Sequence, residues 1–164
     1  MGAYTGMYTE ILARIAEIER SALFTLMGSA VDSKPYFPFK GQEGYPYWTN
    51  RLGTATYTNE EYGMDLLHIT RAVNMRLVVG NADSMYDGEL QTQVNQFIGD
   101  FVLYIHEQQN ARLITTTYPT PMQWLEQELR LVSDTGIIAF QGGGSGSLQV
   151  GIEFVIELDL NIQV

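Results

Sequence analysis

The stretch LQVGIEFVIELDLNIQ, residues 148–163, alternates apolar and polar side chains almost without a break. A period of two over this length predicts a β-strand with one buried face and one wet face. The apolar members are Leu148, Val150, Ile152, Phe154, Ile156, Leu158, Leu160 and Ile162. The opposite face carries three carboxylates, Glu153, Glu157 and Asp159. The strand therefore predicts a sheet that covers a core on one side only.

Three further segments have equally clear periodicity. Residues 65–79 alternate in the same way and predict a second long strand, which Gly80 and the residues after it bring to an end. Residues 8–26 and 86–108 have helical spacing and predict two amphipathic helices. The apolar stripe of the second helix consists of Leu90, Val94, Phe97, Ile98, Phe101, Val102 and Ile105. Long strands and long helices thus occur in the same chain.

Residues 31–63 differ from their surroundings, because three prolines and several glycines are interspersed with aromatic residues. This composition predicts a long ordered loop with one or two short strands, since a flexible linker would be polar. Two interpretations stay open: the loop folds over the body of its own domain, or it packs on a neighbouring subunit. The candidate interface residues are Tyr36, Phe37, Phe39, Tyr47 and Trp48.

Residues 127–141 predict a hairpin, with strands 127–132 and 137–141 on either side of a turn at Ser133–Gly136. The Gly-rich segment 142–147 that follows predicts a flexible loop, and Gly143, Gly144 and Ser145 are further interface candidates. It is not a phosphate-binding loop, because it lacks the Lys-Ser/Thr pair and leads into a strand instead of a helix.

Together these segments predict one structural domain, residues 1–164, of the α+β class. The expected architecture is one mixed, largely antiparallel sheet with two long helices packed on one face. Alternating short strand–helix units are absent from the sequence, which argues against a doubly wound fold.

Composition excludes several kinds of chemistry. The chain has no cysteine, so disulfides, zinc–thiolate sites and thiol nucleophiles are ruled out. Its net charge of −10, with only two lysines, disfavours gripping of DNA phosphates. No apolar run is long enough for a membrane-spanning helix, so we expect no membrane partner. His68 and His106 are the only histidines and have no metal-ligand spacing. We therefore expect no catalytic residue, no metal and no cofactor, and a protein that is not an enzyme.

The acidic face of residues 148–163 also allows two interpretations. In one it is a solvated sheet surface. In the other, copies of the chain form a ring, and Glu153, Glu157 and Asp159 face a channel through which DNA passes without sticking, since like charges repel.

The order of elements resembles the tail terminator proteins of tailed bacteriophages. The resemblance rests on the helix Tyr8–Leu26, the strand Leu67–Val79, the helix Asp87–Gln108 and the acidic-faced strand Leu148–Ile162. It implies a small α+β subunit that forms a ring, expected to be hexameric, on the last ring of the tail tube. Such a ring ends tube growth and joins the tail to the head connector. Its partners would be further copies of itself, the tail tube protein and the neck proteins, at the tail–head junction of a virion made in the host cytoplasm. No residue role carries over, because the family has no shared motif.

Two alternatives stay open at this point. One is another neck or tail component, such as a stopper, an adaptor or a tube protein. The other is a small-molecule or peptide binding module in which Tyr36, Phe39, Tyr47 and Trp48 line an apolar pocket.

Overall fold

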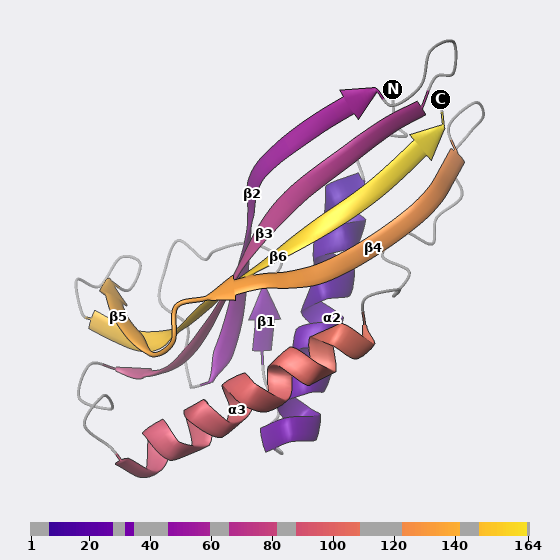
Figure 1. Cartoon of the computed structure of the whole chain (residues 1–164). Coiled ribbons are helices and arrows are strands. Elements are labelled where there is room, and N and C mark those ends of the chain that lie inside the picture. The colour runs from indigo at the N-terminus through magenta and orange to yellow at the C-terminus, as the bar shows by residue number, and fades with distance from the viewer. Residues whose placement is uncertain are drawn as a thin grey trace.

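Two helices and six strands make up the part of the chain that the computed structural model describes (Figure 1). The described residues are 7–27, 32–34, 46–59, 66–81, 88–108, 123–141 and 148–163. In chain order the elements are α2 (Met7–Met27), β1 (Asp32–Lys34), β2 (Tyr47–Asn59), β3 (Leu66–Asn81), α3 (Gly88–Glu107), β4 (Gln123–Asp134), β5 (Ile138–Gln141) and β6 (Leu148–Gln163). The prediction of the α+β class is confirmed, as are both long helices and both long strands.

All strands belong to one sheet with the order β1-β2-β3-β6-β4, and β5 also pairs with β6. Strands β2, β3, β6, β4 and β5 pair antiparallel, whereas the short β1 pairs parallel with β2. β3 and β6 lie at the centre and pair along their whole length, from Leu66 opposite Gln163 to Asn81 opposite Gln149.

The alternation of β6 separates two faces of the sheet. Val150, Ile152, Phe154, Ile156, Leu158 and Leu160 are buried. Four of them pair with buried apolar residues of β3, namely Leu77, Met75, Val73 and Ile69. We call this side the apolar face. The opposite side, which carries Glu153, Glu157, Asp159 and Asn161 of β6, we call the polar face. The predicted amphipathic character of this strand is thus confirmed.

An aromatic cluster joins α3 to the apolar face. The Trp48 ring lies 5.5 Å from the Phe101 ring and 5.9 Å from the Phe154 ring, measured between centroids. Phe101 also contacts Phe154, at 4.7 Å, and stacks on Phe97 of its own helix, at 5.3 Å. Such aromatic pairs stabilise a fold beyond the apolar area that they bury.

The predicted stripe of α3 is correct for Val94, Phe97, Phe101 and Ile105, which are all buried. Val102 differs, because its side chain is 43% exposed. One residue corresponds to about 100° of rotation around a helix, so a side chain next to Phe101 points away from the line that touches the sheet.

The structure corrects the prediction of a loop over residues 31–63. Residues Tyr47–Asn59 form the 13-residue strand β2, which pairs with β3 over its length. Threonine and aromatic residues dominate β2 and favour strands. Gly53, read as a loop signal, lies where the register shifts between Leu52 and Ala55, which is a common place for glycine in a strand.

The predicted hairpin at 127–141 is wrong, because β4 and β5 do not pair with each other. Both pair antiparallel with β6, β4 along residues 154–163 and β5 along residues 148–151. They therefore run in the same direction and form one interrupted strand. At the interruption the Gly136 amide donates to Asp134 Oδ1 at 2.8 Å, and Gly136 has a φ of 66°. Asp and Gly thus mark a break in this strand instead of a reversal.

Helix α2 reaches the sheet through a buried polar contact. The Asn50 side-chain amide donates to Glu19 Oε1 at 2.5 Å, and both residues are fully buried. At its N-terminal end Tyr8 lies under the Arg71 guanidinium, 4.8 Å from ring centre to Cζ. Burial is the main effect that raises the Tyr8 pKa above its usual value, and Arg71 partly opposes it.

The aromatic cluster gives a first testable prediction. Phe101→Ala should lower the free energy of unfolding by about 3–5 kcal/mol, because it removes a fully buried ring and leaves a cavity. Urea unfolding followed by far-UV circular dichroism measures the change. The matched control is the neighbouring Val102→Ala, which should shift stability by no more than about 0.5 kcal/mol, because this side chain is 43% exposed. Equal losses in the two variants would contradict the packing.

Two glycines give a second prediction, of opposite sign. A Cβ at Gly151 would collide with the Leu77 carbonyl oxygen, next to the register shift between Val78 and Gly80. Gly151→Ala should therefore destabilise the fold by about 1–3 kcal/mol through overpacking. Gly99, in the exposed part of α3, has nothing within 4 Å of such a Cβ, and Gly99→Ala should stabilise by about 1 kcal/mol. The same unfolding assay compares the two, and a neutral Gly151→Ala would refute the close approach.

Candidate interaction surface

Ion pairs cross the polar face of the sheet. Arg130 of β4 binds two carboxylates of β6: its Nη1 lies 2.6 Å from Asp159 Oδ2, and its Nη2 contacts Glu157 Oε1. Arg76 of β3 lies 3.5 Å from Glu153, between Nη2 and Oε1. Glu153, Glu157 and Asp159 thus lie on one face of one strand, partly exposed, and each has a cationic neighbour in its own chain. Their negative charge is balanced in large part by the two arginines.

His68 belongs to the same face and to a hydrogen-bond network that joins β3 to β6. Its Nδ1 lies 2.5 Å from Asn161 Oδ1, and its Nε2 lies 3.2 Å from Thr70 Oγ1 and 3.3 Å from Asp159 Oδ1. The Thr70 hydroxyl donates to Asp159 Oδ1 at 2.9 Å. A nucleophilic hydroxyl needs to donate to its general base, so this geometry does not make His68 the base of Thr70. The network joins four neighbouring polar side chains across β3 and β6.

The described ranges contain no set of side chains that could bind a metal ion. No group of three or more histidine, aspartate or glutamate side chains comes together there in a way that could hold an ion. His106, the second histidine, is exposed in the last turn of α3.

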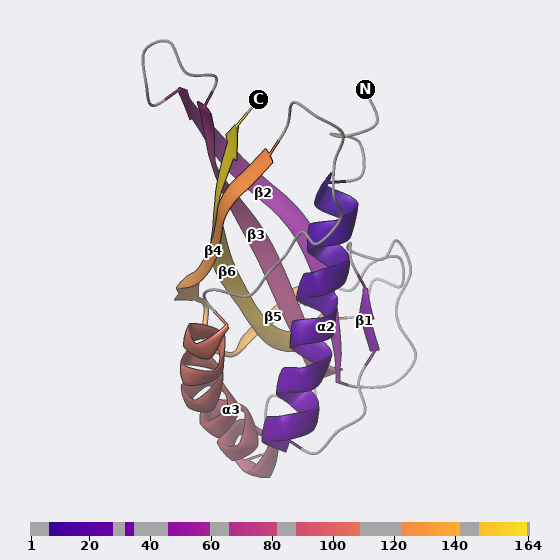
Figure 2. The same ribbon diagram turned by 90° about the vertical axis from the view of Figure 1, so that its right-hand side faces the viewer.

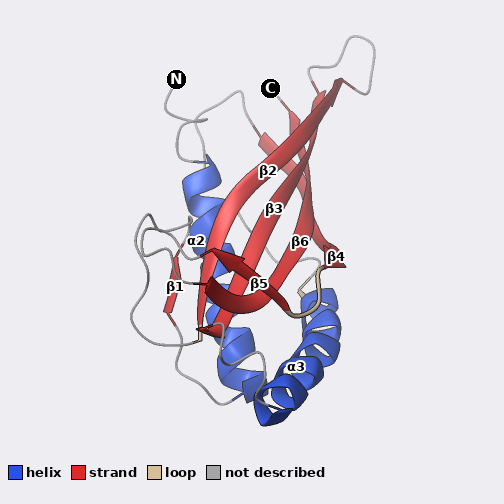
Figure 3. Ribbon diagram, turned by 90° about the vertical axis from the view of Figure 1, so that its left-hand side faces the viewer, coloured by secondary structure: helices blue, strands red, loops and turns tan. Residues whose placement is uncertain are grey.

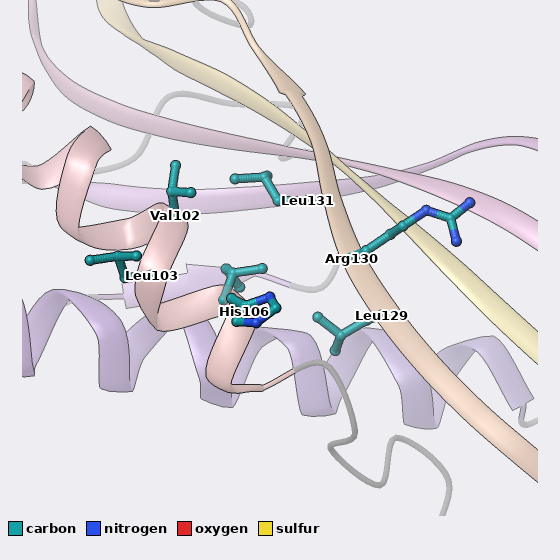
Figure 4. Close-up of a pocket in the computed structure, with 7 residues that line it drawn as sticks. Val102, Leu103, His106, Leu129, Arg130 and Leu131 are labelled. Carbon is teal, nitrogen blue, oxygen red and sulfur yellow. The ribbon is translucent and has the colours of Figure 1, made fainter.

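A groove runs between the C-terminal half of α3 and the strand β4 (Figure 4). Its volume is about 210 Å³, and we call it the α3–β4 groove. The residues that line it are Val102, Leu103, Ile105, His106, Leu129, Arg130 and Leu131. Leu103 and Val102, which both line the groove, are 66% and 43% exposed. The groove thus carries exposed apolar side chains, which is typical of a surface that binds another protein.

Two of the predicted interface residues lie in the core. Tyr47 is buried at the start of β2, where its hydroxyl accepts from Gln149 Nε2 at 3.0 Å. Trp48 is fully buried in the aromatic cluster. Contrary to the prediction, Tyr47 and Trp48 therefore pack inside their own chain. The other candidates, Tyr36, Phe37, Phe39, Gly143, Gly144 and Ser145, lie outside the described residues.

Sequence reasoning missed the α3–β4 groove, although a signal for it exists. Residues 101–105, FVLYI, are five consecutive apolar residues in a helix, more than one buried stripe can take up. The surplus members Val102 and Leu103 both line the groove, together with the buried Ile105. The sequence contains no comparable signal for the ion pairs of Arg130, because its carboxylate partners lie 27 and 29 residues further along the chain, on another strand.

Comparison with models of known protein families found no match, and comparison with curated protein sequences found none either. Neither α2 nor α3 combines the length and the apolar character that a membrane-spanning helix needs.

The ion pairs on the polar face give a third prediction. Arg130→Gln leaves Glu157 and Asp159 side by side on β6 without their shared cation, and like charges repel. We expect a loss of less than about 1 kcal/mol, because the Arg130 side chain is 51% exposed. The loss should be larger at low salt than at high salt, since salt screens exposed charges. Urea unfolding at two salt concentrations measures both effects.

The matched control is Arg14→Gln in α2, which removes an exposed cation whose ion pair within the described part of the chain is with the single carboxylate of Glu17. Its salt dependence should be smaller, because no pair of carboxylates is left behind. An Arg130→Gln variant whose stability loss is independent of salt would contradict the assigned electrostatics.

Proposed function

We propose that this chain is a virion structural protein of a tailed bacteriophage. It forms a ring, expected to be hexameric, that caps the tail tube, ends tube polymerisation and joins the tail to the head connector. The support is the resemblance in the order of elements: the helix α2, the long strand β3, the helix α3 and the acidic-faced strand β6 follow one another in that order, with the strands β1 and β2 before β3 and the strands β4 and β5 before β6. Its location would be the tail–head junction.

We infer that α2 and α3 form one layer on the apolar face, as the sequence leads us to expect (Figure 2). Phe101 of α3 packs on Phe154 of β6. Glu19 of α2 accepts a hydrogen bond from Asn50 of β2, whose register partner Met75 lies opposite Phe154. Asn50 and Phe154 thus belong to the same face, and each is touched by a different helix.

The polar face is the observation that carries the proposal. It extends over the long strands β3, β6 and β4, and its side chains are fastened by ion pairs instead of surrounding a pocket. The ion pairs there join three carboxylates to two guanidinium groups, and Glu128 of β4 adds a further carboxylate to this face. Such a face has no surplus of cations with which to hold phosphates, so DNA could move past it without being bound. A channel wall of this kind also suits a stopper, an adaptor or a tube protein.

Of the four residues predicted to line an aromatic binding pocket, two do not support that alternative. Tyr47 and Trp48 are buried in the core and cannot line a site that is open to a ligand. No observation in the described ranges favours catalysis, so we retain the proposal of a protein that is not an enzyme and has no cofactor.

Static light scattering of the purified protein over a range of concentrations tests the proposed assembly. We expect a discrete ring-sized species, or a monomer that converts to one as concentration rises. The same sample with purified tail tubes should bind at tube ends in electron micrographs. A protein that stays monomeric at every concentration and does not bind to tail tubes would refute the proposal.

A further inference from the structure

The sheet has two long outer strands that are only partly covered. At one side β1 pairs with Tyr47–Thr49 of β2, and no described strand pairs with the outer edge of β2 beyond Thr49. At the other side no described strand pairs with the outer edge of β4 (Figure 3). Outer strands present rows of backbone N–H and C=O groups that readily pair with another chain.

The directions of these two strands suit pairing between copies. β2 is antiparallel to β3, β3 to β6, and β6 to β4, so β2 and β4 run in opposite directions. A second copy in the same orientation would therefore place its β2 antiparallel to β4. That pairing continues the alternation of the sheet across the boundary between the copies.

The charges of the two strands favour this pairing over pairing between like strands. β2 contains Arg51 and no acidic residue. β4 contains Glu126, Glu128 and Asp134 against Arg130. A β4–β4 contact would bring carboxylates together, and like charges opposite each other destabilise a sheet. A β4–β2 contact joins an acidic strand to a weakly basic one.

The exposed apolar residues lie on the matching side. Tyr57 of β2 is 58% exposed, and its register partner Ile69 belongs to the apolar face. In β4, Leu129 and Leu131 pair with Leu158 and Ile156 of that same face and line the α3–β4 groove. A neighbouring β2 would thus bring Tyr57 to the side of the sheet on which the groove opens. Strand addition typically gains affinity from backbone bonds and specificity from such pockets.

We propose that copies of this chain join edge to edge, with β4 of one copy pairing antiparallel with Asn50–Asn59 of β2 in the next. The contact is heterologous, so repeated pairing closes into a ring if the rotation between copies allows. This inference rests on the proposed ring-forming function and names the surface that builds it. The continuous sheet would present the polar faces of all copies to one side.

Cysteine crosslinking tests the contact directly, because the natural chain has no cysteine. The test variant carries Thr56→Cys and Glu128→Cys, two exposed positions on the polar face. Thr56 lies opposite Thr70, Thr70 opposite Asp159, and Asp159 opposite Glu128, so the two positions belong to one row across the sheet. Within one chain three strand spacings separate them, about 14 Å. A bis-maleimide linker shorter than that separation can therefore join them only between copies. A second variant, Thr56→Cys with Ser133→Cys, covers a shifted register.

The expected result is a ladder of dimers, trimers and higher species on a denaturing gel for at least one double variant. The matched controls are the single variants. Each alone should stay monomeric, and a mixture of Thr56→Cys with Glu128→Cys or Ser133→Cys chains should stop at a dimer. Circular dichroism confirms that every variant is folded.

The contradicting outcomes separate this inference from the function on which it rests. If light scattering detects a ring but neither double variant crosslinks, copies join through another surface and the edge pairing is wrong. Strong dimers in a single variant would likewise overturn it in favour of pairing between like strands. If neither crosslinks nor oligomers form, and tail tubes are not bound, the proposed function fails together with the contact.

Discussion

The pairing of β3 with β6 is the constraint on which the rest of the structure depends. These two strands share a register from Leu66 opposite Gln163 to Asn81 opposite Gln149, and every other strand of the sheet attaches to one of them or to β2 beside them. Because side chains alternate, a slip of one residue would turn the buried row of β6 toward water. The register therefore fixes which face carries the core and which carries the carboxylates.

The apolar face then sets the position of the helices. Phe154 of β6 and Trp48 of β2 present adjacent rings, and α3 lays Phe97 and Phe101 on them. This contact brings the C-terminal half of α3 close to β4 and creates the groove that Val102 and Leu103 line. The same packing that completes the core thus leaves an apolar surface at the edge of the sheet. Core and candidate interface are consequences of one contact.

The sequence predicts elements whose pattern is strictly local. The period of two in residues 148–163 and the helical stripe around Phe97 and Phe101 were sufficient for β6 and α3. The strand β2 was missed because glycine and proline near it suggested a loop, whereas its pairing with β3 decides its conformation. The in-line arrangement of β4 and β5 was missed for a related reason: turn residues mark where a strand breaks and do not say which strand it pairs with next.

The candidate surface was predictable to a similar extent. Alternation alone placed Glu153, Glu157 and Asp159 on one face. Their pairing with Arg76 and Arg130 depends on which strands are neighbours, and one sequence does not contain that information. Trp48 illustrates the opposite error, since an aromatic residue suits an interface and a core equally well, and only its neighbours distinguish the two.

The central place of β6 has a consequence for biosynthesis. β6 is made after β3, β4 and β5, yet it pairs with all three of them. The sheet therefore cannot close while the ribosome is still translating the segments before residue 148, and its long-range contacts favour slow folding. Until β6 emerges, β3 has β2 on one side and an unpaired edge on the other, and unpaired strand edges make partly folded chains prone to aggregation. The acidic charge of the chain, −10 overall, would help to keep such intermediates apart.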